Sequence, residues 1–200
     1  MMKKWVIFDF DGTLANSKAI AFQVINRLAD LHGFPKFTPE KAMSMQGQEK
    51  TLLSQFPLIA NDFYTLYKES LKDIPLFDGI QEMLKRLRDK GMQIAVISSN
   101  EESNIRQYFQ VQGIDFITEV YTSSDLYGKD TMINTFCEKH SLSKDEVIYV
   151  GDEVRDIRAC HKCGVDVIWV DWGYDTAVQA VPEKPTYTAK EPTELLALVE

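Results

Sequence analysis

Two acids follow the first apolar segment of the chain, in the run Asp9-Phe10-Asp11-Gly12-Thr13. Carboxylates two residues apart, just past a strand, point to the same side, and a divalent cation placed against them relieves their mutual repulsion. Gly12 allows the backbone to turn tightly there. An Asp-Gly pair is also common in solvated turns, but the apolar strand before it argues against a plain surface turn. This run is therefore a candidate metal and catalytic site.

A second acidic group occurs late in the chain, in Gly151-Asp152-Glu153-Val154-Arg155-Asp156. Asp152 and Asp156 lie four residues apart, where an apolar strand leads into a helix. Both could approach a cation bound at Asp9 if the two strands are neighbours in one sheet. The alternative is a helix N-terminus that attracts acids through its dipole and has no further role.

Two further positions could bind an anion. Ser98-Ser99-Asn100 ends an apolar strand, and its hydroxyls, together with the backbone N–H groups of a following helix, suit a phosphate. Ordinary capping of that helix by Ser99 or Asn100 explains the same residues equally well. Lys129 stands ahead of another helix, where a lysine is most often a solvated surface charge.

Short apolar strands alternate with helices through most of the chain. We expect strands at residues 3–9, 93–98, 116–121, 147–151 and 167–170, with a weak edge strand near 186–188. Helices are expected from Ile80 to Gly91, after Ser98, and at residues 132–140, 156–163 and 192–199. This alternation predicts an α/β fold, a Rossmann-like parallel sheet with helices on both faces.

The segment between the first and second strands has a helical period instead. Apolar residues recur at helical spacing from Ser17 to Leu31, and Gly33 follows as a stop. Further helices are expected to start at Thr38-Pro39-Glu40, to run through Leu52 to Pro57, and to start near Asn61. We therefore predict an α-helical cap domain at 16–75 inserted into a core domain at 1–15 and 76–200. Ligands bind beyond the carboxyl ends of parallel strands, so this insertion would hang over the site.

Composition limits the partners. The net charge of −8 argues against nucleic acid or an anionic membrane as the main partner, because both would repel an acidic surface. The apolar run after Met1-Met2-Lys3-Lys4 is too short for a signal peptide or a membrane span, so we expect a cytoplasmic protein. Cys160 and Cys163 have C-x-x-C spacing, but no second Cys/His pair completes a zinc site, and we interpret both as packing residues. The sequence leaves monomer and homodimer open.

The clusters occur in the order of the four motifs of the haloacid dehalogenase superfamily of phosphotransferases, which the sequence resembles. Asp9-Phe10-Asp11-Gly12-Thr13-Leu14 is similar to the first motif and Ser98 to the second. Lys129 is similar to the third, and Gly151-Asp152 with Asp156 to the fourth. The likeness spans nearly the whole chain. It is strongest to the phosphoglycolate phosphatase-like branch, whose small helical cap the insertion resembles.

The resemblance implies a Mg²⁺-dependent phosphatase acting on a small phosphorylated metabolite. Asp9 would be the nucleophile that forms an aspartyl-phosphate, and Asp11 the general acid and base. The metal would be held by Asp9, Asp11 (through its main-chain carbonyl), Asp152 and Asp156. It would offset a repulsion of about 4 kcal/mol between unit charges 4 Å apart at an effective dielectric near 20. Lys129 would neutralise Asp9 and a phosphoryl oxygen.

The phosphoryl group itself would be bound by hydroxyl, amide and ammonium donors, namely Thr13, Ser98, Ser99, Asn100 and Lys129. A phosphomutase that returns the phosphoryl group to a sugar is the nearest alternative. A catalytically silent binding or regulatory protein on the same fold and a dehalogenase are the others.

Two departures from the relatives concern the cap. Asn16 replaces an acid that relatives commonly carry, and no arginine that could grip a carboxylate stands between Met43 and Gln48. The second departure argues against phosphoglycolate itself as the substrate. The cap aromatic residues could line the pocket, but at helical spacing we expect them to pack: Phe22, Phe56, Phe63 and Tyr67.

Overall fold

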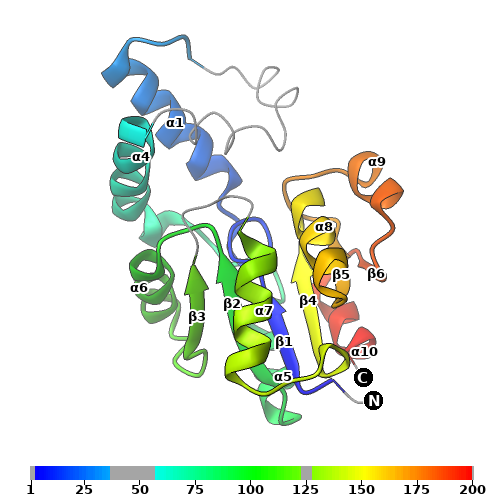
Figure 1. Ribbon diagram of the computed structural model, residues 1–200. Coiled ribbons are helices and arrows are strands. Elements are labelled where there is room, and N and C mark those ends of the chain that lie inside the picture. The colour runs from blue at the N-terminus through cyan, green and yellow to red at the C-terminus, as the bar shows by residue number, and fades with distance from the viewer. Residues whose placement is uncertain (1–2, 37–56, 123–127, 200) are drawn as a thin grey trace.

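The computed structural model describes residues 3–36, 57–122 and 128–199 (Figure 1). Within these residues a six-stranded sheet has the order β3-β2-β1-β4-β5-β6, and every neighbouring pair is parallel. The strands are β1 (Trp5–Phe8), β2 (Gln93–Ser98), β3 (Glu119–Thr122), β4 (Val147–Gly151), β5 (Asp166–Val170) and β6 (Tyr187–Ala189). The predicted parallel α/β sheet is confirmed.

The order of the strands reverses beside β1. The chain moves outward from β1 to β2 and β3, then returns to the other side of β1 with β4. Phe8 is in register with Val150, and the backbone N–H of Asp9 donates to the carbonyl oxygen of Val150 at 2.9 Å. The carboxyl ends of β1 and β4 therefore lie side by side at the switch point, where open α/β sheets bind their ligands.

Helices cover both faces of the sheet, so both faces are apolar. Val6 and Phe8 enter one buried cluster, while Ile7 enters the other, as the two-residue period of a strand requires. The first cluster includes residues of α5 (Ile80–Asp89), α6 (Glu102–Gln112) and α10 (Leu195–Leu198). The second includes residues of α7 (Lys129–Lys139) and α8 (Val154–Cys163). Figure 1 shows α7 and α8 on the near face.

Two helices lie beyond the carboxyl ends of the strands (Figure 1): α1 (Lys18–His32) and α4 (Pro57–Glu69). They pack on each other through apolar residues such as Leu28 and Leu66. The helix α1 ends where predicted, because Gly33 adopts φ +72° and its N–H donates to the carbonyl oxygen of Ala29. The limits of the cap domain, 16–75, stay a proposal.

Several expected boundaries of the helical insertion differ or fall outside the described residues. The helix expected near Asn61 begins at Pro57, which suits a first helical position because proline lacks an N–H there. The short helix η1 (Leu71–Asp73) follows α4. The expected helix at Thr38-Pro39-Glu40 lies outside the described residues. So does the one expected from Leu52 to Pro57, apart from Pro57 itself, which begins α4 and does not end a helix.

In the core, the third strand begins at Glu119 and not at Phe116, because its ladder with β2 pairs only residues 119–122. The N-cap position of the helix after β2 is Glu101, which makes no side-chain capping hydrogen bond, so the alternative of a cap at Ser99 or Asn100 does not hold. Both α7 and α8 start a few residues earlier than predicted, at Lys129 and Val154. Short turns complete the chain: η2 (Lys144–Glu146), α9 (Ala177–Ala180), η3 (Val181–Glu183) and η4 (Pro192–Glu194).

The three cysteines are buried free thiols. Cys137, Cys160 and Cys163 belong to the apolar cluster under α7 and α8, as the packing interpretation predicted. Burial raises the pKa of each thiol, which keeps it protonated and unreactive at neutral pH. Among the helices of the described ranges, none combines the length and apolar character needed to cross a membrane.

Candidate active site

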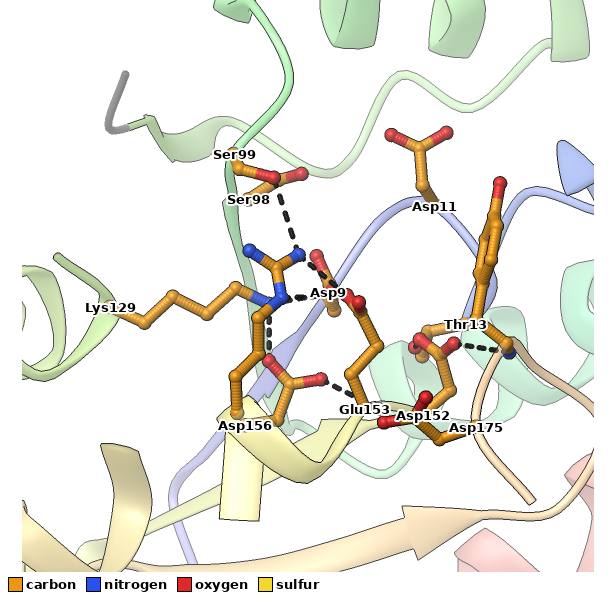
Figure 2. Close-up of polar contacts among 12 residues, drawn as sticks. Asp9, Asp11, Thr13, Ser98, Ser99, Lys129, Asp152, Glu153, Asp156 and Asp175 are labelled. Carbon is orange, nitrogen blue, oxygen red and sulfur yellow. Dashed lines mark hydrogen bonds and ion pairs between the residues drawn. The ribbon is translucent and has the colours of Figure 1, made fainter. Parts of the chain in front are cut away.

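Three carboxylates converge at the switch point of the sheet (Figure 2). Asp9 follows β1, Asp152 follows β4, and Asp156 lies in the first turn of α8. Each offers an oxygen, these oxygens all lie within 4.8 Å of one another, and all three side chains are completely buried. Burial first, and then the charges of neighbouring acids, raise the pKa of Asp152 well above its ordinary range. The cluster therefore disfavours its own ionised state and is suited to a cation.

Lys129 supplies one positive charge to this cluster. It is the first residue of α7, its side chain is 3% exposed, and its Nζ lies 2.7 Å from Oδ2 of Asp9. The same ammonium forms an ion pair with Asp156. Burial raises the pKa of Asp156, and the charge of Lys129 acts against that rise. The lysine that could have been a solvated surface charge is thus part of the site.

The three acids and Lys129 carry two net negative charges when all four are ionised. Buried carboxylate oxygens are the ligands that hard divalent cations such as Mg²⁺ prefer. The residues present therefore fit the expected ion in both charge and ligand type. Asp9, Asp152 and Asp156 are the side chains that would hold it.

Asp152 is fixed through both carboxylate oxygens. The hydroxyl of Thr13 donates to its Oδ1 at 2.7 Å, and the backbone N–H of Tyr174 donates to its Oδ2 at 2.7 Å. The indole N–H of Trp169 donates to its main-chain carbonyl oxygen at 2.8 Å. Thr13 was predicted to bind phosphate, but its hydroxyl proton is directed at Asp152. This hydrogen bond orients a carboxylate of the cluster, and phosphate binding by Thr13 stays a prediction.

Two glycines permit the close approach of backbone to Asp152. A Cβ at Gly12 would stand 2.3 Å from Oδ2 of Asp152, and Gly12 also has φ +84°. A Cβ at Gly173, in the loop after β5, would stand 2.1 Å from the Cβ of Asp152. Any side chain at either position would displace the carboxylate. Gly173 carries no motif in the sequence, although its place beyond a strand end was a usable signal.

Asp11 lies outside the carboxylate cluster. Figure 2 shows its carboxylate pointing away from Asp9 and Asp152. Its Oδ1 accepts a hydrogen bond from the hydroxyl of Tyr67, and its Oδ2 accepts one from Nδ2 of Asn100 at 2.8 Å. The carboxylate of Asp11 therefore lies outside the group of three acids, and Nδ2 of Asn100 is directed at it. Phosphate binding by Asn100 stays a prediction.

Two serines lie above Asp9 at the end of β2. The hydroxyl oxygen of Ser98 accepts from the backbone N–H of Asn100 at 3.1 Å, and the hydroxyl can still donate its own proton to an anion. The Oγ of Ser99 accepts from Arg155 at 3.3 Å. Both serines are buried and lie beside Asp9. They remain the predicted phosphate ligands.

Arg155 and Glu153 were not singled out from the sequence, although both belong to the acidic run after β4. Their side chains form an ion pair at 2.5 Å. Burial acts to lower the pKa of Arg155, but the charges of Glu153, Asp156 and Asp9 raise it, so the guanidinium stays charged. The backbone N–H of Glu153 donates to Oδ2 of Asp156 at 3.1 Å, which fixes that carboxylate. Arg155 therefore adds a positive charge to the site, and the backbone of Glu153 holds the carboxylate of Asp156 in place.

Known proteins are similar to this chain over nearly its whole length. Residues 6–170 match the family model described as haloacid dehalogenase-like hydrolase. A relative from Synechococcus elongatus named phosphoglycolate phosphatase is 27% identical, over 97% of this chain and 96% of its own length. A relative of the same name from Pasteurella multocida is 24% identical, over 98% of both chains.

Solved structures agree on the fold. A predicted phosphoglycolate phosphatase from Haemophilus somnus superposes with a TM-score of 0.86 at 21% identity, covering 100% of this chain and 99% of that one. A haloacid dehalogenase-like hydrolase from Streptococcus pneumoniae superposes with a TM-score of 0.85 at 18% identity, covering 99% of both. The match of the family model covers most of the sequence and includes every acid of the site. The chain therefore belongs to the haloacid dehalogenase-like hydrolase family.

Proposed function

We propose that this protein is a Mg²⁺-dependent phosphatase that hydrolyses a small phosphate monoester through an aspartyl-phosphate on Asp9. The proposal is carried by one observation, the buried group of Asp9, Asp152 and Asp156 against Lys129 at the switch point of the sheet. Family membership and relatives named phosphoglycolate phosphatase support the same reaction class.

Asp9 is arranged as a nucleophile. Its Oδ1 accepts a hydrogen bond from the backbone N–H of Phe10 at 2.7 Å, and its Oδ2 pairs with Lys129. The ammonium offsets the repulsion between this carboxylate and the incoming phosphoryl group. Asp9, Asp152 and Asp156 would hold a Mg²⁺ ion, which would supply further charge neutralisation.

The reaction divides into two displacements at phosphorus. In the first, an oxygen of Asp9 forms a bond to phosphorus while the bond to the ester oxygen breaks, and Asp11 gives that oxygen a proton. In the second, water attacks the phosphorus of the aspartyl-phosphate, Asp11 takes a proton from it, and Asp9 is released with inorganic phosphate. Ser98, Ser99 and Lys129 hold phosphoryl oxygens during both steps.

The substrate is proposed as a class, a small phosphate monoester. Phosphoglycolate is a candidate within that class because relatives carry its name. The segment Met43 to Gln48, where the sequence has no arginine for a carboxylate, lies outside the described residues.

The test is release of inorganic phosphate from a panel of phosphorylated metabolites, with Mg²⁺ or with a chelator. We expect release that depends on Mg²⁺ and that the substitution Asp9→Asn abolishes without changing the circular dichroism spectrum. Activity that survives Asp9→Asn would refute the assignment of the nucleophile. Conversion of a sugar phosphate to its isomer without phosphate release would indicate a phosphomutase. Halide release from a haloacid would indicate a dehalogenase, and no turnover of any compound would indicate a binding protein.

A further inference from the structure

One side chain of the helical pair reaches the proposed acid and base. Tyr67 lies on α4, 56 residues from Asp11 in the sequence, and its hydroxyl donates to Oδ1 of Asp11. The side chain is 1% exposed and stacks on Phe63 of the same helix, with ring centroids 5.8 Å apart. Periodicity alone indicates a packing residue here, but the position of the hydroxyl adds a polar contact that packing does not require.

Asn100 holds the second oxygen of Asp11 from the opposite side. Its amide orientation is determined, because its Oδ1 accepts from the backbone N–H of Glu101 at 2.7 Å and from Nδ2 of Asn104 at 3.2 Å. Nδ2 of Asn100 must therefore face Asp11, where it donates at 2.8 Å. The carboxylate of Asp11 is thus held between one donor from α4 and one donor from the core.

Tyr67 is suited to remain a donor. Burial first, and then the charge of Asp11, raise the pKa of its phenol well above the usual value, so the hydroxyl keeps its proton at neutral pH. Tyr64, one turn earlier, directs its hydroxyl to the main-chain carbonyl oxygen of Ser99 at 3.1 Å instead. The two tyrosines of α4 therefore donate to different groups, Tyr67 to the carboxylate of Asp11 and Tyr64 to a main-chain oxygen.

We propose that Tyr67 is a positioning residue that aligns the carboxylate of Asp11 for proton transfer. Proton transfer then depends on how α4 packs against the core domain. This inference rests on the proposed function, because it assumes that Asp11 protonates the leaving oxygen. A carboxylate that accepts a hydrogen bond at each oxygen is held in one orientation. Loss of one of these hydrogen bonds allows it to rotate about its side-chain torsions. The role differs from packing because it acts only on the step in which the proton moves.

The test compares two esters whose leaving groups differ in their need for a proton. An alkyl phosphate leaves as a strongly basic alkoxide and needs the acid, whereas 2,4-dinitrophenyl phosphate leaves as a stable anion and does not. The measured quantity is kcat/KM, which reports the steps up to loss of the leaving group. General acid catalysis contributes about 10²- to 10⁴-fold, so we expect Tyr67→Phe to lower kcat/KM for the alkyl ester by about 10- to 100-fold. The value for the dinitrophenyl ester should change by less than about 3-fold.

Three further variants make the result specific. In an Asp11→Asn background, Tyr67→Phe should cause no additional loss on the alkyl ester, because Tyr67 acts through Asp11. Asn100→Ser removes the other donor and should show the same selective loss, which keeps the inference testable if Tyr67→Phe folds poorly. Tyr64→Phe is the matched control on the same helix, and any loss that it causes should be equal for both esters.

Equal loss on both esters in Tyr67→Phe, or no loss on either, would overturn the positioning role. Such a result, obtained with an active parent protein, leaves the phosphatase assignment intact. A parent protein that releases no phosphate from either ester with Mg²⁺ present would instead overturn the phosphatase assignment and this inference together.

Discussion

Nζ of Lys129 lies 2.7 Å from Oδ2 of Asp9, and both side chains are almost completely removed from solvent. The same ammonium pairs with Asp156, so one lysine is shared between the proposed nucleophile and an acid of the cation site. The buried ammonium shared by Asp9 and Asp156 fixes these two carboxylates relative to each other. The end of β1 and the start of α8 would not do so without it.

Loss of this lysine should be costly for the folded protein. Lys129→Met leaves buried carboxylates without their partner, and breaking such a pair costs about 3–5 kcal/mol. We expect a decrease of that size in the free energy of unfolding of the metal-free protein, measured by urea denaturation. The control Lys162→Met removes a lysine whose pair with Asp130 is exposed, and it should change little. A Lys129→Met variant as stable as its parent would show that the buried pair does not hold the site together.

Thr13 should determine how well the site binds its cation. Thr13→Val keeps the shape of the side chain but removes the hydroxyl that donates to Asp152 at 2.7 Å. Loss of an outer hydrogen bond of this kind lowers metal affinity by about 10- to 100-fold, so the Mg²⁺ concentration for half-maximal activity should rise by that factor. Thr13→Ser retains the hydroxyl and should remain close to the parent. If Thr13→Val shows the same Mg²⁺ dependence but a raised KM for the ester, the hydroxyl contacts phosphate, as the sequence analysis predicted.

Substitution of two glycines with positive φ, Gly12 and Gly113, distinguishes the effect of backbone strain from the effect of a side chain that crowds the site. Gly12 and Gly113 have φ +84° and +66°, but an added Cβ meets Asp152 at Gly12 and nothing within 4 Å at Gly113. Gly113→Ala should cost only the left-handed strain, about 1–2 kcal/mol of unfolding free energy, and should retain activity. Gly12→Ala should lose activity at temperatures where it is still folded, because Asp152 must move. Equal activity in the two variants would show that the close approach at Gly12 is dispensable.

The sequence predicted the fold best where its pattern of apolar residues reflects burial. Strands buried on both faces read as short apolar runs, and the acids that end these runs mark the carboxyl ends of the strands, so the sheet and the positions of Asp9 and Asp152 were predictable. Parallel order follows from the alternation with helices. Strand and helix boundaries were less accurate, as at Glu119, because ladder pairing depends on the neighbouring strand and not on the local pattern.

Side-chain partners were not predictable from the same pattern. The donors to Asp11 come from Tyr67 and Asn100, 56 and 89 residues away, and the partner of Asp152 comes from Thr13, 139 residues away. Periodicity assigned Tyr67 to packing because it detects the buried ring and not the direction of the hydroxyl. The local sequence around Asn100 suggested a helix cap or a phosphate ligand, and it gave no sign of the tertiary contact with Asp11.

The phosphorylation state of Asp9 during turnover tests the central claim most directly. The protein is mixed with Mg²⁺ and an ester labelled in its phosphoryl group, quenched in acid within the first turnover, digested, and analysed by mass spectrometry. We predict a phosphoryl group on the peptide that contains Asp9, sensitive to hydroxylamine as an acyl phosphate should be, and absent with a chelator. Steady release of phosphate with no phosphoryl group on that peptide at any time, or with the group on another residue, would contradict the account.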